Sequence, residues 1–214
     1  LTKVTDGAVS FDGTGDYLSI SQSDDFNLLD DGTFTIEFFL YVRALNGGDP
    51  SYADYFGVFD GGSNGLLIYQ IGSNLDVYIN SGQRCTTTHP GTNKWHHIAV
   101  TRDGTTLRLF VDGILKSTST ASLGSDYSGA LQIGGDPSRN DLDGFISNVR
   151  VIKGTALYTS NFTPPTEPLT NVTNTKLLCC QSPTNVRLSP VAPNVGVTTT
   201  TRFNSNFESI PTTV

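Results

Sequence analysis

The amino-acid sequence predicts an all-β protein, a two-sheet antiparallel β-sandwich of the jelly-roll type. Three observations lead to this fold class. The acidic residues are 17 Asp and only 3 Glu, and Met is absent, so residues that favour turns replace residues that favour helices. The dipeptide Asp-Gly, which suits tight turns between antiparallel strands, occurs seven times. Between these turns lie short runs of β-branched and aromatic residues that alternate with period two. An all-helical protein is therefore excluded.

The longest of these runs, residues 33–42, shows how a strand is identified. Its even-numbered positions from Phe34 to Leu40 are apolar and the odd-numbered positions are mostly polar, which predicts a strand with one buried face. The same pattern predicts about a dozen short strands in all. In chain order they are 8–11, 17–20, 33–42, 55–59, 66–71, 76–79, 95–102, 106–111, 114–116, 131–133, 145–152 and 176–180. The strands from 95 to 116, joined by two Asp-Gly turns, form a meander, and only 154–158 indicates a helical turn.

The composition changes near residue 182, and this change divides the chain into two parts. Residues 1–182 carry the strand pattern and form the sandwich domain. Residues 183–214 are rich in Thr and Pro and cannot bury a core of their own. We expect an extended C-terminal arm that docks on a neighbouring subunit, which would give a homo-oligomer. The alternative, an arm that folds back on its own sandwich, stays open.

The net charge of -7 restricts the partners that this chain can have. Nucleic acids and anionic membrane surfaces attract basic patches, so neither is expected as a partner. No apolar run reaches the 18 or so residues of a transmembrane helix, so membrane insertion is not expected.

No sequence motif of a nucleophilic, phosphate-binding, zinc or dinucleotide site occurs. The three glutamates, Glu37, Glu167 and Glu208, are far apart, so no strand carries the closely spaced acids of a sandwich-type glucanase. We therefore predict a protein without enzymatic activity. A pair of Asp residues from different strands remains an open alternative.

The histidines and paired cysteines are interpreted as structural residues. His96 and His97 are neighbours on a strand, so they face opposite sides and cannot ligate one metal ion. His89 lies in a Thr-rich turn and is predicted to face solvent. Cys179 and Cys180 lack the spacing of a metal site and are interpreted as small strand residues, one of which faces the core.

Five blocks of the sequence occur in the order of a known family. They are AVSFDGTGDYL at 8–18, FTIEF at 34–38, WHHIAVTR at 95–102, LFVDG at 109–113 and LDGFISNVRV at 142–151. Over about residues 5–180 the chain resembles a laminin G-like domain of the concanavalin A-like lectin/glucanase superfamily. The resemblance implies a β-sandwich jelly roll. Modules of this family bind glycans or proteins, often through a calcium ion at one rim.

A narrower resemblance concerns the end of the domain. The blocks GTALY at 154–158, FTPP at 162–165 and LLCCQS at 177–182 are similar to modules in structural and appendage proteins of marine tailed phages, cyanophages among them. This implies a non-catalytic virion protein, a capsid decoration or tail appendage subunit. Its partners would be other virion proteins, copies of itself and host surface glycans. The alternatives are a secreted, extracellular carbohydrate-binding or adhesion module of a bacterial surface protein and, third, a β-glucanase-type hydrolase.

A calcium site is implied by resemblance to the pentraxin arrangement. The block LQIGGD ends at Asp136, and acids at such a strand end bind calcium in that arrangement. Asn64, in the loop before residues 66–68, matches the position of a second ligand-bearing segment. Both side chains offer the oxygen ligands that calcium takes. The chain lacks the Glu-Gln-Asp run of the family, so one weak site is expected at most. That both residues simply form turns is the open alternative.

Overall fold

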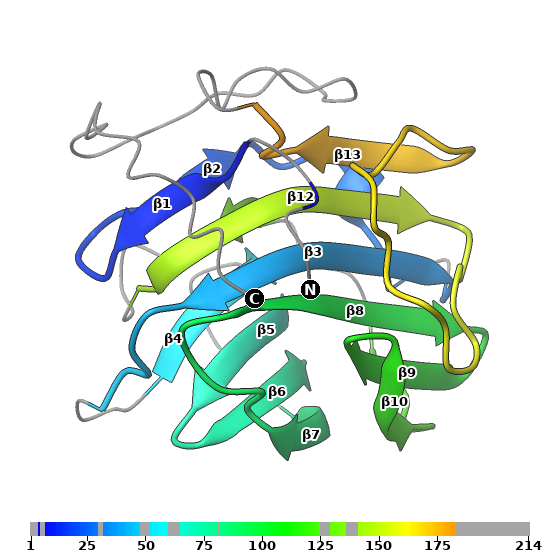
Figure 1. The fold of residues 1–214 in the computed structure, drawn as a ribbon. Coiled ribbons are helices and arrows are strands. Elements are labelled where there is room, and N and C mark those ends of the chain that lie inside the picture. The colour runs from blue at the N-terminus through cyan, green and yellow to red at the C-terminus, as the bar shows by residue number, and fades with distance from the viewer. Residues whose placement is uncertain are drawn as a thin grey trace.

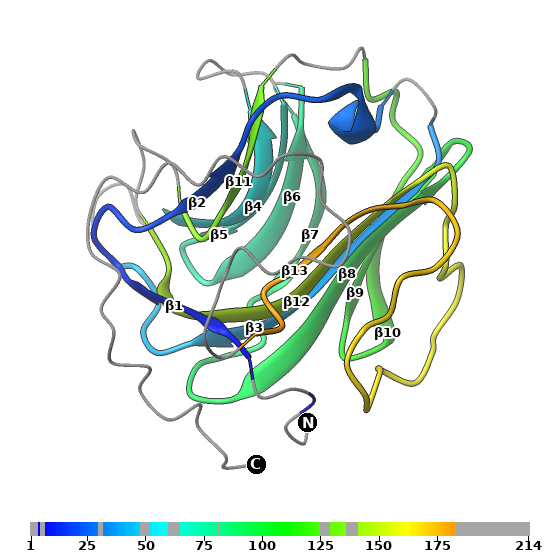
Figure 2. The same cartoon turned by 90° about the horizontal axis from the view of Figure 1, so that it is seen from above.

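The computed structural model describes residues 4, 7–29, 32–47, 52–59, 65–80, 82–124, 129–135 and 141–182. Within this part of the chain, two antiparallel β-sheets face each other (Figures 1 and 2). The all-β sandwich predicted from the sequence is therefore confirmed. Residues 183–214 lie outside the described residues, so the docking of the arm stays a prediction.

The seven-stranded sheet is built around β12. β3 lies along one edge of β12, while β1 and β13 share the other edge, β1 opposite 143–146 and β13 opposite 149–152. β8, β9 and β10 follow β3 in that order. The strands of this sheet are β1 (Val9–Asp12), β3 (Phe34–Val42), β8 (Trp95–Asp103), β9 (Thr106–Val111), β10 (Ile114–Ser119), β12 (Asp143–Lys153) and β13 (Thr175–Cys179).

The six-stranded sheet has the order β2-β11-β4-β5-β6-β7. Its strands are β2 (Leu18–Ile20), β4 (Tyr52–Phe59), β5 (Gly65–Ile71), β6 (Asn74–Ile79), β7 (Gln83–Thr88) and β11 (Ala130–Ile133). The sequence pattern misses β7, because five of its six residues are polar and only Cys85 faces the core. It also misses a short 3-10 helix, η1 (Asp24–Phe26), which the Ser23 hydroxyl caps by accepting a hydrogen bond from the N–H of Asp25.

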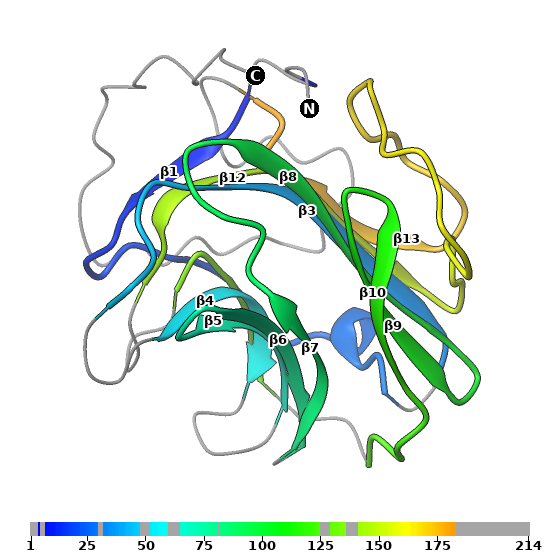
Figure 3. The same cartoon turned by 60° about the horizontal axis from the view of Figure 1, so that its bottom comes forward.

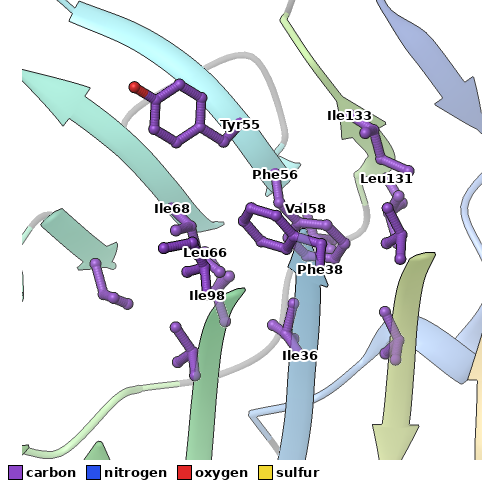
Figure 4. Close-up of a cluster of buried hydrophobic side chains, with 14 of the residues drawn as sticks. Ile36, Phe38, Tyr55, Phe56, Val58, Leu66, Ile68, Ile98, Leu131 and Ile133 are labelled. Carbon is purple, nitrogen blue, oxygen red and sulfur yellow. The ribbon is translucent and has the colours of Figure 1, made fainter. Parts of the chain in front are cut away.

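The hydrophobic core fills the space between the two sheets (Figure 4). Phe38 of β3 and Phe56 of β4 stack across this space with their ring centroids 6.4 Å apart. Both side chains are almost completely buried, and burial of one such ring stabilises the fold by about 1.5–3 kcal/mol. The alternation of apolar residues along β3 places Phe38 between the sheets, and a register shift between Asp54 and Phe56 brings both Tyr55 and Phe56 of β4 into the same core.

The prediction that residues 33–42 form a strand with one buried face is wrong, because all nine residues of β3 are buried. The segment between β12 and β13, residues 154–174, lies outside the seven-stranded sheet (Figure 2), and we call it the strap. Hydroxyls on the outer face of the sheet bind its backbone: Thr35 Oγ1 donates to the carbonyl of Thr155, and Thr101 Oγ1 donates to that of Tyr158. The strap thus covers a face that periodicity alone assigns to solvent.

Residues 154–158, expected to form a helical turn, are irregular chain at the start of the strap. The expectation is wrong because this segment follows the sheet surface instead of closing local hydrogen bonds. No helix in the described part of the chain is long and apolar enough to cross a membrane.

Candidate functional site

The calcium ligands expected from the sequence, Asn64 and Asp136, lie outside the described residues. Among the described acids, buried Asp141 accepts a hydrogen bond from the backbone N–H of Gly15 and so holds the turn that follows β1. Over the described ranges, no three His, Cys, Asp or Glu side chains converge as metal ligands. Calcium binding therefore stays a prediction.

Glu37, one of the three glutamates, is fully buried on the outer side of β3 beneath the strap. Its carboxylate accepts hydrogen bonds from Arg150 Nε (2.8 Å), His97 Nε2 (3.0 Å) and the hydroxyl of Tyr158 on the strap (3.0 Å). Burial alone would raise the pKa of Glu37, but His97 and Arg150 outweigh it and lower this pKa. Every bonding direction of the carboxylate is directed at the protein, so Glu37 joins the strap to the sheet and does not face a substrate.

His96 and His97 do face opposite sides of β8, as expected. His97 Nε2 bonds to Glu37 on the outer side, whereas His96 Nδ1 lies 2.7 Å from a carboxylate oxygen of Asp112. The prediction that His89 faces solvent is wrong: its side chain is buried and its Nε2 lies 3.0 Å from the hydroxyl of Tyr55. The turn that contains His89 folds against the end of the sandwich, which the local sequence does not reveal.

Cys179 and Cys180 both belong to the core cluster, so the prediction that only one of them faces the core is wrong. β13 ends at Cys179, and Cys180 has a left-handed φ of 60°, so the alternation of side chains stops there. Both are free thiols, and their Sγ atoms are 3.5 Å apart. The hydrogen bond with Cys179, together with burial, raises the pKa of Cys180 well above its usual value, which makes it an unreactive thiol.

A second apolar cluster lies on the outer face of the six-stranded sheet. Leu67 and Tyr69 of β5 alternate with the core residues of that strand, and the half-buried rings of Tyr52 and Tyr78 pack against them from β4 and β6. We call these four residues the tyrosine face. β4, β5, β6 and β7 lie side by side in Figure 3. The rings of Tyr69 and Tyr78 meet edge to face with centroids 6.4 Å apart.

Polar side chains lie in the same cross-strand row as the central ring. The strand register places Asp54 of β4 opposite Tyr69, Tyr69 opposite Asp76 of β6, and Asp76 opposite Thr86 of β7. The Asp76 carboxylate accepts hydrogen bonds from Gln83 Nε2 and Thr86 Oγ1, both at 2.5 Å. Aromatic rings therefore lie beside carboxylate, amide and hydroxyl groups on one sheet face.

The outer faces of the two sheets differ in how far their aromatic residues are covered. On the seven-stranded sheet, Tyr41, Trp95 and Phe145 form a cluster whose members are all buried. On the tyrosine face, Tyr52 and Tyr78 remain half-buried. Ile71, paired with Tyr52 across the strands, is 40% exposed. The tyrosine face is therefore the candidate binding surface among the described residues. Sequence reasoning missed it, although residues 66–69 are apolar on both strand faces.

A jelly-roll-type sandwich of two antiparallel sheets is an architecture that lectin domains use. The family model described as the concanavalin A-like lectin/glucanases superfamily matches residues 12–157, so the chain belongs to this laminin G-like family. The resemblance stated from the sequence is confirmed at this level. Among curated proteins, no relative matches the sequence.

Solved structures share the fold at low sequence identity. A heptameric pentraxin from Limulus polyphemus is 15% identical, with a TM-score of 0.52 over 74% of this chain and 81% of the pentraxin. Mouse laminin α1 domains LG4-5 are 15% identical, with a TM-score of 0.54 over 78% of this chain and 48% of theirs. A Bacteroides ovatus protein assigned as carbohydrate-binding is 17% identical, with a TM-score of 0.56 over 72% and 45%. This chain thus spans about half of the last two proteins, and the likeness concerns the fold.

Proposed function

We propose that this chain is a non-catalytic, lectin-like module that binds glycans through the tyrosine face. The observation that carries the proposal is the group of tyrosine rings on β4, β5 and β6, two of them half-buried, beside the exposed Gln83 and Thr86 of β7. Membership of a lectin/glucanase superfamily and the fold shared with a Bacteroides protein assigned as carbohydrate-binding support it.

The chemistry of the tyrosine face fits a sugar. The C–H side of a pyranose ring is apolar and packs on an aromatic ring, while its hydroxyls need acceptors and donors close by. Tyr52 and Tyr78 supply half-buried rings, and the exposed side chains of Gln83 and Thr86 supply polar groups in neighbouring positions. A sheet face with rings on three neighbouring strands suits an oligosaccharide chain that crosses those strands.

The non-catalytic part of the proposal rests on Glu37. Glycoside hydrolysis needs two carboxyl groups that face a scissile bond, one as acid and the other as base or nucleophile. Glu37 is instead sealed beneath the strap by Arg150, His97 and Tyr158. Its use in a structural network favours a binding module over the β-glucanase alternative.

Glycan binding can be measured directly with matched variants. We expect Tyr52→Ala and Tyr78→Ala each to weaken binding of laminarin or agarose oligosaccharides about tenfold or more, since each removes one stacking ring. Ile114→Ala is the control, because Ile114 is 46% exposed on the other sheet. Titration calorimetry reports the affinities. Equal affinity in all four proteins, or no binding to any glycan of the panel, would contradict the proposal.

The cellular context is proposed from the carboxy-terminal block at 154–182. Its similarity to appendage modules of marine phages supports a virion location, with virion proteins, other copies of this chain and host glycans as partners. The secreted bacterial module is the alternative. Mass spectrometry of purified virions distinguishes them: the virion proposal expects peptides of this chain in the particles. Detection only in bacterial culture medium would contradict it.

A further inference from the structure

We propose that the tyrosine face binds stretches of at least three consecutive sugar units and discriminates against mono- and disaccharides. This inference rests on the proposed glycan-binding function and adds the chain length of the ligand. It comes from the positions of the two half-buried rings, Tyr52 on β4 and Tyr78 on β6. These two strands lie on either side of β5 (Figure 3).

The strand register places the two half-buried rings at opposite ends of a diagonal. Tyr52 lies opposite Ile71 of β5. Tyr78 lies opposite Leu67, which precedes Ile71 by four residues. Four residues of a strand extend about 13 Å, and strands two places apart in a sheet are separated by roughly 9.6 Å. The backbones at Tyr52 and Tyr78 are therefore about 16 Å apart.

Tyr69 lies on this diagonal between the two half-buried rings, but it is largely covered. Along β5 it is two residues from Leu67 and two from Ile71, and it is 9% exposed. Its ring meets that of Tyr78 edge to face, with the centroids 6.4 Å apart. Leu67 and Tyr69 are the buried residues against which the half-buried rings pack. The surfaces on which a sugar can stack therefore belong to Tyr52 and Tyr78.

The distance between these two rings sets the length of chain that contacts both. A pyranose unit, built from bonds of about 1.5 Å, spans roughly 5 Å between the two oxygens that link it into a chain. The 6.4 Å from the Tyr78 ring to the Tyr69 ring already exceeds one unit, and Tyr52 lies beyond Tyr69. A disaccharide therefore reaches one ring, and a third or fourth unit is needed to reach the other. Once the first ring is bound, the second contact is intramolecular, which raises the affinity of the longer chain.

A length series of glycans tests the inference. Laminari-oligosaccharides of one to six units and agaro-oligosaccharides of two, four and six units are titrated against the wild-type protein by calorimetry. We expect the affinity to rise at least about tenfold between the disaccharide and the shortest chain that reaches both rings, and to rise little beyond it. A gradual rise in proportion to length, as repeated use of a single-sugar site would give, overturns the inference.

Variants locate the length dependence in the spacing of the rings. Tyr78→Ala should remove the step, so that the hexasaccharide binds about as weakly as the disaccharide. Asn74 is exposed and lies opposite Ile71, in the same cross-strand row as Tyr52. Asn74→Tyr combined with Tyr78→Ala thus places the second ring two strand spacings from Tyr52, about 10 Å away, and the step should return at a shorter chain. Ile114→Ala, on the other sheet, should keep the wild-type step.

Circular dichroism checks that each variant is folded. If the double variant does not fold, Tyr52→Ala takes its place, because it removes the opposite end of the diagonal and should abolish the step as Tyr78→Ala does.

The outcomes separate this inference from the proposed function. Mono- or disaccharides that bind as tightly as the hexasaccharide overturn the length requirement and leave the glycan-binding function standing. A step that persists in Tyr78→Ala has the same meaning, because the chain length is then recognised elsewhere. Binding of no member of either series overturns the proposed function and the inference with it.

Discussion

Burial sets the charge of His89 in the folded protein. Its Nδ1 accepts a hydrogen bond from the N–H of Gly91, and its Nε2 lies against the hydroxyl of Tyr55. Burial, with a smaller contribution from His96, lowers the pKa of His89 from 6.5 to about 4. Between these two values the folded imidazole is neutral while the unfolded one binds a proton.

The free energy of unfolding should therefore depend on pH between 6.5 and 4. The contribution of His89 is fully present above pH 6.5 and is lost as the pH falls towards 4, by about 2–3 kcal/mol in all. Urea unfolding at pH 7, 5.5 and 4.5 measures the slope, and His89→Gln should flatten it. Glu37, whose pKa is lowered, loses its contribution only below its unfolded value of about 4.3, outside most of this window. An identical slope in the variant would contradict the assignment.

Asp136 and Asn64 are the two residues proposed as calcium ligands. If Asp136 and Asn64 supply ligands, calcium should bind once, with an affinity in the millimolar range that is typical of weak extracellular sites. Asp136→Asn and Asn64→Ala should each abolish the calorimetric signal, and Asp103→Asn should preserve it. No heat from the wild-type protein at millimolar calcium would count against the site.

Among the elements, the strap depends on a close approach at the turn between β9 and β10. Gly113 has a φ of +75°, and a Cβ there would overlap the carbonyl oxygen of Phe162. In addition, the carbonyl oxygen of Gly113 accepts a hydrogen bond from the N–H of Phe162 at 2.9 Å. The rings of Tyr158 and Phe162, stacked 3.6 Å apart, then pack against Phe110. The glycine therefore sets the distance between strap and sheet.

Gly113→Ala should displace the strap, and Gly104→Ala is its matched control. Gly104 follows an Asp in the preceding turn with a φ of +54°, but a Cβ there meets no heavy atom within 4 Å. Both variants carry the strain of a left-handed alanine, about 1–2 kcal/mol. Gly113→Ala should lose at least about 1 kcal/mol more in urea unfolding and speed hydrogen exchange in the strap. Equal losses in the two variants would show that the strap contact contributes nothing.

The fold was predictable from the sequence because the elements repeat a simple pattern. Apolar alternation and Asp-Gly turns located most strands of both sheets to within a few residues. β7 was not predicted, because its sequence, QRCTTT, is nearly all polar. The burial of the outer face of β3 was not predicted, because the strap that covers this face comes from residues about 120 positions later. The periodicity of a strand indicates which of its residues share a face, but it does not indicate which distant segment packs on that face.

The candidate site was less predictable than the fold. The tyrosine face combines residues from three strands, and only the register brings Tyr52, Tyr69 and Tyr78 onto one surface. The apolar residues Leu67 and Tyr69 at outward positions were its only sequence signal. The calcium ligands expected from family resemblance fall outside the described residues and stay a prediction.

The expected assembly state of the protein depends on the arm at 183–214. If it crosses to a neighbour, deletion of these residues should lower the mass measured by light scattering to that of a monomer, with the sandwich still folded. An arm that folds back on its own sandwich predicts the same mass for both chains. Retention of the truncated chain on virion particles would likewise contradict a role for the arm in attachment.

The two ends of the sandwich lie against each other. β1 and β13 share one edge of β12, and the Ser147 hydroxyl lies 2.5 Å from the carbonyl oxygen of Gly7 and 3.3 Å from that of Cys180. A circular permutant that joins these ends by a short linker and opens the exposed turn at Gly104 should therefore fold, which circular dichroism and urea unfolding can check. For the same reason, the sandwich could be inserted into one surface loop of a host polypeptide. Because its two ends lie close together, the insertion would not force the two sides of that loop apart.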